Sequence, residues 1–164
     1  MSIKESLIIE MQRETDNTKR LLERLNQDHW TWKPHEKSIS AGALAKHIVE
    51  LQSWLPNALE GDSFNYATDY QPNPSATFEE LIQILEAGLA KNIEFANSKS
   101  DEFWFDEWTF KYGEHVIGVM QKMGAYRFVI TNHLIHHRGQ LSVYLRLLDI
   151  PVPGIYGPSA DETM

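Results

Sequence analysis

Four segments of the chain carry apolar residues at the three- and four-residue spacing of an amphipathic α-helix. Packing such helices on one another is the simplest way for this chain to bury its apolar faces. Ser40 precedes the second segment as a predicted N-cap, and Thr77 with Glu80 three residues later is typical of a capping box before the third. The predicted helices span residues 3–25, 41–59, 77–97 and 123–148.

Two of the connections between these helices are long. Residues 61–74 are predicted to form a loop, and residues 98–122 a long crossover or a short helical turn. No stretch alternates convincingly enough to predict a strand. We therefore expect an all-α fold, a four-helix bundle with a long crossover connection, formed by a single domain over residues 1–164.

The composition excludes several classes of function. The chain has no cysteine, so any metal must be held by imidazole or oxygen. A formal charge of −8 argues against binding to nucleic acid. The first residues, MSIKESLIIEMQRETDN, have charges scattered through them, which argues against a secretory signal or a membrane span. We expect a cytoplasmic protein that does not insert into membranes.

Three histidines lie close together in the stretch NHLIHHRGQ of the fourth predicted helix. Residues on an α-helix are about 100° apart, so His133 and His137 lie only about 40° apart, whereas His136 lies about 60° to the other side. Arg138 and the other arginines lie away from the shared face, so we expect both imidazoles to point inward. Such a pair is a familiar chelate for a divalent metal, although it can also form a pH-sensitive polar patch.

The second predicted helix supplies another candidate ligand, His47, on an apolar face. A histidine in this position is either a hydrogen-bonded core residue or a ligand. With His133 and His137 it would form a three-histidine site with an open coordination position, as catalytic metals require. A fourth protein ligand, Glu14 or Glu50, would instead close the site. Glu14 interrupts the apolar stripe of the first helix, so we expect it at the edge of that stripe.

Other residues on the ligand-bearing faces are candidates for contact with a bound metal or substrate. Gln140 lies one turn after His137, where it could orient a ligand. Three aromatic residues could line a pocket, although aromatic residues at helical spacing more often belong to the core. They are Tyr126, Tyr144 and Trp54. The remaining histidines, His29, His35 and His115, are expected at the surface.

Taken together, these motifs resemble the DinB/YfiT-like family of metal-dependent proteins. HHRGQL and the tail YGPSADE carry most of the likeness, and WKPHEKSISAGALAKHI resembles the family's approach to its second helix. The resemblance covers nearly the whole chain. It implies a four-helix bundle in which His47, His133 and His137 hold a divalent ion such as nickel, zinc or iron. It also implies a homodimer, for which the outward apolar Phe128 is a further indication.

The family resemblance implies metal binding more directly than it implies a reaction. Some relatives resemble thiol S-transferases that use mycothiol or bacillithiol, others are iron-dependent domains of sulfoxide synthases, and many have no assigned reaction. One expectation is a metal-dependent enzyme of thiol S-transferase or hydrolase type, which acts on a small molecule with or without a low-molecular-weight thiol. The alternative is a non-catalytic metal-binding or interaction bundle.

Overall fold

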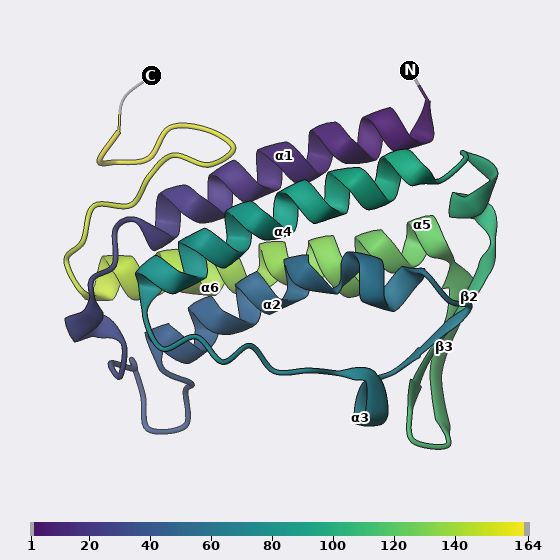
Figure 1. Ribbon diagram of the computed structural model, residues 1–164. Helices are drawn as coiled ribbons and strands as arrows, with labels where there is room; N and C mark the ends of the chain where they lie inside the picture. Colours follow the sequence, from purple (N-terminus) through teal and green to yellow (C-terminus); the bar gives the residue numbers. More distant parts are fainter. Residues whose placement is uncertain (1, 163–164) are drawn as a thin grey trace.

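The computed structural model describes residues 2–162 as four long helices with a small sheet at one end (Figure 1). Helix α1 packs on α4 and α6, and α2 packs on the same two helices, so the four surround a common core. The long helices are α1 (Ile3–Leu22), α2 (Ala41–Leu59), α4 (Phe78–Ser98) and α6 (Asn132–Leu147). The chain is therefore mostly helical, as the periodicity predicts.

The two helix starts that were predicted with caps are confirmed. The Ser40 side chain accepts a hydrogen bond from the Ala43 amide at 3.2 Å. Thr77 and Glu80 form the complete capping box that the sequence indicates for α4. Helix α1 ends at Leu22, before the predicted end at residue 25.

Helix α2 contains a proline, and the neighbouring helix compensates for it. Pro56 has no amide hydrogen, so the carbonyl of Gln52, four residues earlier, cannot receive its helical bond. The buried side chain of Asn92 on α4 donates to that carbonyl at 2.9 Å instead. This bond ties α2 to α4 in the middle of the core.

A three-stranded sheet corrects the prediction of an all-α fold. Residues 61–74 and 98–122, expected to lack strands, contain β1 (Ser63–Asn65), β2 (Glu107–Tyr112) and β3 (His115–Gln121), with the short helices α3 (Tyr66–Asp69) and η2 (Glu102–Phe105). The strand order is β1-β2-β3; β1 runs parallel to β2, and β3 antiparallel to it. Trp108 of β2 is fully buried and donates to the Ala58 carbonyl at 2.7 Å, which fixes the sheet to the end of α2.

A two-residue turn joins β2 to β3. Tyr112 pairs with His115, and Gly113 between them adopts a φ of +57°, a conformation that glycine adopts at little cost. The register shifts next to Ile117, because Phe110 pairs with Gly118 and the next residue of β2 pairs with Val116. A register shift of this kind bends a strand locally. The hairpin itself projects away from the long helices (Figure 1).

The predicted helix over residues 123–148 is interrupted. It begins as α5 (Lys122–Ala125), continues as the π-helical segment η3 (Tyr126–Thr131), and only then becomes α6. A π-helical turn contains one more residue than an α-helical turn, so the positions before it rotate by roughly 100° relative to those after it. The interruption ends just before His133.

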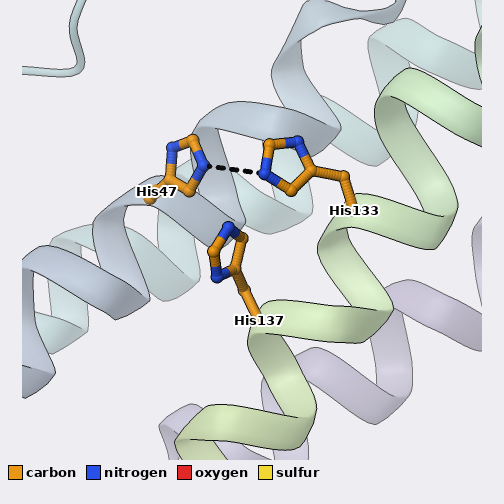
Figure 2. Close-up of side chains that lie close together, drawn as sticks. All are labelled: His47, His133 and His137. Carbon is orange, nitrogen blue, oxygen red and sulfur yellow. Dashed lines mark hydrogen bonds between the residues drawn. The ribbon is translucent and has the colours of Figure 1, made fainter.

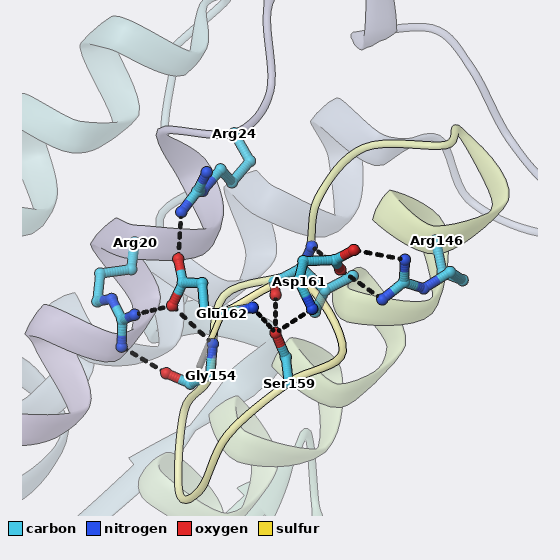
Figure 3. A network of polar contacts seen from close by, with 8 residues as sticks. Arg20, Arg24, Arg146, Gly154, Ser159, Asp161 and Glu162 are labelled. Atoms are coloured by element: carbon cyan, nitrogen blue, oxygen red, sulfur yellow. Dashed lines mark hydrogen bonds and ion pairs between the residues drawn. The ribbon is translucent and has the colours of Figure 1, made fainter. Parts of the chain in front are cut away.

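The C-terminal tail is held against α1 and α6 by ion pairs (Figure 3). Glu162 accepts hydrogen bonds from Arg20 and Arg24 of α1, and Asp161 binds Arg146 of α6 at 2.6 Å. The Ser159 hydroxyl donates to the tail's own backbone at Val152, at 2.6 Å. These contacts connect the YGPSADE segment to both helices.

The core contains apolar side chains from the long helices and from the sheet. Burial of each large side chain contributes about 1.5–3 kcal/mol. The largest fully buried side chains are Trp104, Trp108, Leu7, Leu21, Leu22, Leu44, Ile48, Leu51, Leu55, Leu59, Leu81 and Leu85. Within residues 2–162, no helix combines the length and apolarity needed to cross a bilayer.

Candidate metal centre

Three histidines from two helices converge on the same side of the molecule. His47 lies on α2, and His133 and His137 lie one turn apart on α6 (Figure 2). One nitrogen from each ring lies within 4.8 Å of the others, and Nε2 of His47 is 3.5 Å from Nε2 of His133. The structure thus brings together the three residues that the sequence singles out as metal ligands.

The position of this cluster follows from how α6 packs. Leu134, Leu141 and Leu145 form its fully buried stripe, and His133 and His137 lie beside that stripe, facing α2. Both imidazoles are half-buried, so the prediction that they point inward is corrected: they lie at the rim of the α2–α6 contact. A site at the rim is open to solvent and still has fixed ligands.

The cluster fits a divalent metal ion in dimensions and chemistry. Two imidazole nitrogens bound at about 2.0–2.1 Å to a tetrahedral ion are about 3.3 Å apart, close to the 3.5 Å between His47 and His133. The described histidine, aspartate and glutamate side chains that group in this way are His47, His133 and His137. Neutral imidazole suits zinc, nickel and iron alike.

The electrostatic environment keeps two of these rings in the form that can bind a metal. Burial, followed by the neighbouring imidazoles of His137 and His47, lowers the pKa of His133 to about 4. Burial also lowers the pKa of His47, with a further contribution from His137. A neutral ring offers its nitrogen lone pair without first losing a proton.

The lowered pKa of His133 predicts how the stability of the metal-free protein depends on pH. Between about pH 4 and 6.5 the folded chain binds fewer protons at His133 than the unfolded chain does. The free energy of unfolding should therefore fall as the pH drops from about 6.5 to about 4. Urea unfolding at pH 7 and pH 5 should show a smaller loss in His133→Asn than in the wild type. An equal loss in both proteins would contradict the prediction.

Two polar side chains lie where they can orient the ligands. Gln140 Oε1 is 2.7 Å from Nδ1 of His137, so this Nδ1 carries the hydrogen and Nε2 has the free lone pair. Glu50 Oε2 is 3.8 Å from Nδ1 of His47, within reach of a hydrogen bond after a small rotation of the ring. Both contacts resemble the partners that fix the tautomer of metal-binding histidines.

Glu50 also holds the connection between α3 and α4 against α2. The carboxylate is buried and accepts hydrogen bonds from the Tyr70 hydroxyl at 2.9 Å and from the Asn73 amide at 2.7 Å. From the sequence, Glu50 is only a possible fourth ligand. Its position about one turn after His47 is the sequence signal that indicates a role beside the metal. No spacing in the sequence indicates that Tyr70 and Asn73 contact Glu50.

Glu14 is neither an edge residue nor a metal ligand. It is buried and forms an ion pair with Arg138, which also donates to the Glu14 carbonyl at 3.0 Å. The Tyr156 hydroxyl of the tail donates to the same carboxylate at 2.7 Å. The expectation that Glu14 lies at an edge is wrong, because Arg138 neutralises it inside the core.

The three candidate aromatic residues pack against other parts of the protein. Tyr144 contacts Trp32 edge to face, and its hydroxyl donates to the Ile39 carbonyl at 3.2 Å. The rings that Trp54 contacts are Phe64, Tyr66 and Tyr70. Tyr126 is buried next to Trp104, because the π-helical segment rotates it away from the face of His133. These placements agree with the core alternative for all three.

The other histidines lie outside the cluster. His136 is exposed on the flank of α6, where its ring stacks edge to face on that of His137. Nδ1 of His29 and of His35 each accept a nearby backbone amide hydrogen, at 3.2 and 3.1 Å. His115 is exposed at the start of β3. The helical phase assigned to residues 133–137 is therefore the observed one.

Comparisons with known proteins agree with the fold. The family model described as the DinB family matches residues 1–163. The uncharacterized proteins YjoA and YrdA of Bacillus subtilis are 28% identical over 131 residues and 27% identical over 149 residues. These alignments cover 79% and 91% of this chain, and 80% and 85% of the two relatives.

Two solved structures share this fold. The crystal structure of the DinB-like protein YjoA from Bacillus subtilis superposes with a TM-score of 0.70 at 21% identity, over 88% of this chain and 92% of that one. A DinB-like protein from Bacillus cereus superposes with a TM-score of 0.72 at 20% identity, over 94% of this chain and 98% of that one. A helical chain with a small sheet, matched to the family model over nearly its whole length, belongs to the DinB family.

Proposed function

We propose that this chain binds one divalent metal ion through His47, His133 and His137, and that it is a metal-dependent enzyme. The observation that carries the proposal is that one ring nitrogen from each of three histidines, on two packed helices, lies within 4.8 Å of the other two. Three ligands from a protein, with a further position open to solvent, are typical of catalytic metal sites, whereas structural sites have four. In this proposal the four long helices act as a bundle that holds the ligands.

The surroundings of the cluster favour an open coordination position. Glu14 cannot act as a fourth ligand, because its carboxylate is bound to Arg138 and Tyr156. Glu50 lies on the Nδ1 side of His47, away from the Nε2 atom that faces His133. These contacts support the enzyme over the non-catalytic alternative, which requires a closed site.

The reaction we propose is a thiol S-transfer or a hydrolysis on a small-molecule substrate in the cytoplasm. A divalent ion with three neutral ligands keeps its full charge and can lower the pKa of a water molecule or a low-molecular-weight thiol toward neutrality. The protein's own contribution is to keep His47 and His133 neutral through burial, and to orient His137 and His47 through Gln140 and Glu50.

Metal content is the direct test of this proposal. Protein purified without a nickel column should contain, or take up on dialysis, one equivalent of zinc, nickel or iron per chain by elemental analysis. The double variant His47→Ala, His133→Ala should contain none. Failure of the wild type to retain any of the three ions at micromolar concentration would refute the proposal.

The role of Glu50 can be tested separately. Glu50→Gln should lower the affinity for the metal by about 10-fold or more, because a carboxylate that orients a ligating imidazole also raises its basicity. Glu60→Gln is the matched control, since Glu60 lies at the end of the same helix and its side chain is 65% exposed. Calorimetric titration of both variants gives the two affinities. Equal affinities would show that Glu50 serves only to hold the connection between α3 and α4.

A further inference from the structure

Strand β3 forms an open edge of the sheet. It pairs with β2 on one side, and no strand among residues 2–162 pairs with its other side. The backbone N–H and C=O groups of an edge strand can pair with a strand from another chain. Figure 1 shows the β2–β3 hairpin projecting away from the long helices, so that this edge is accessible.

The edge lacks most of the features that protect such strands. Natural edge strands are usually interrupted by lysine, another charged residue or proline, and β3, with the sequence HVIGVMQ, contains none of these. The register shift next to Ile117 is its one protective feature. The side chains of Val116, Ile117 and Val119 are about half exposed, at 48%, 52% and 54%. The strand thus offers an uncharged, apolar edge on a chain with a net charge of −8.

The order of residues in β3 is complementary to itself. Read from either end, the strand is polar, apolar, apolar, glycine, apolar, apolar, polar. Antiparallel pairing of two copies about a twofold axis at Gly118 would place Ile117 opposite Val119, and His115 opposite Gln121. Opposed β-branched residues stabilise a sheet, and a twofold interface requires a patch that matches itself.

We propose that two copies of this chain associate through their β3 strands to form one continuous sheet. The apolar residues then meet apolar residues, and the polar ends meet each other. Apart from His115 at its start, the strand offers no titratable side chain to a charged partner, so the chemistry of the strand favours a second copy. This surface is distinct from the region of Phe128, which is 73% exposed on η3.

Two matched substitutions test this interface. Val119→Lys places a charge on the outer side of the sheet, opposite Thr109, and Val143→Lys makes the same change on α6 at nearly the same exposure, 54% against 55%. By sedimentation velocity at tens of micromolar, the wild type and Val143→Lys should be dimers, whereas Val119→Lys should be a monomer. The measurements are made with EDTA, so that they do not depend on metal binding.

Two further measurements distinguish loss of the interface from loss of the fold. Circular dichroism must show that Val119→Lys is folded; Ile117→Lys serves as a second variant with the same expected result. Hydrogen exchange of the β3 amides should slow as the wild-type concentration rises. A wild type that stays monomeric, or a dimer that Phe128→Lys dissociates and Val119→Lys does not, would overturn the proposal.

Discussion

Replacing His137 by alanine should abolish tight binding of a divalent metal ion. The residue would supply one of only three ligands, and its Nδ1 is already held by Gln140. Metal sites in small domains bind with about 10–16 kcal/mol, so the loss of one ligand in three should cost several kcal/mol, or at least about 100-fold in affinity. Calorimetric titration of the metal-free protein at pH 7 measures this change.

His136→Ala is the control for that experiment. The ring of His136 is a neighbour of the His137 ring, but it is exposed on the flank of α6 and does not belong to the group of three. Its replacement should leave one ion bound per chain with nearly unchanged affinity. Retention of the ion by His137→Ala, together with its loss from His136→Ala, would show that the ligand assignment is wrong.

Replacing Glu14 by alanine should destabilise the fold by about 3–5 kcal/mol, because Arg138 would be left charged and unpaired in the core. The Arg138 side chain is only 3% exposed, and that of Glu14 is 11% exposed. Glu14 also accepts the Tyr156 hydroxyl, so the substitution releases a contact to the tail as well. Urea unfolding monitored by circular dichroism gives the free energy of unfolding.

A double variant separates the cost of an unpaired charge from the value of the pair itself. Glu14→Leu with Arg138→Met removes both charges and should recover most of the lost stability, since apolar replacements of buried pairs are often neutral. Arg146→Ala, which breaks an exposed ion pair to Asp161, should have a much smaller effect than Glu14→Ala. A double variant as unstable as Glu14→Ala would show that the unpaired charge is not the cause of the loss.

The approximate positions of α1, α2 and α4 could be predicted from the sequence, because their signals are local, whereas the π-helical interruption before α6 could not. Apolar spacing and the caps at Ser40 and Thr77 depend on residues within one or two turns, and α2 spans the predicted residues 41–59. The relative directions of His133, His136 and His137 also follow from the geometry of a single helix. The pairing of His133 with His137, and the exclusion of His136, could therefore be predicted from the sequence.

The sheet could not be predicted in the same way. Strand β1 has three residues, and it pairs with β2 more than forty positions later in the chain. The sequence of β2 does not alternate clearly between buried and exposed residues, because Trp108 is buried under α2 whereas Tyr112, on the same face, is exposed at the hairpin turn. Strand pairing depends on contacts that are distant in sequence, so propensity alone leaves such short strands ambiguous.

The sequence by itself determined where the long helices lie approximately, the caps at Ser40 and Thr77, and which histidines of the last helix share a face, because each depends on neighbouring residues. Only the tertiary structure decided that His47 meets His133 and His137 at a rim of the helix pair, that Glu50 turns toward His47, and that Glu14 neutralises Arg138. A single helix cannot show which of its faces meets another helix. The contact between helices is the one that minimises the free energy of all the packed elements together. Whether a polar residue is buried therefore depends more on its hydrogen-bonding or charged partner than on its position along the apolar stripe.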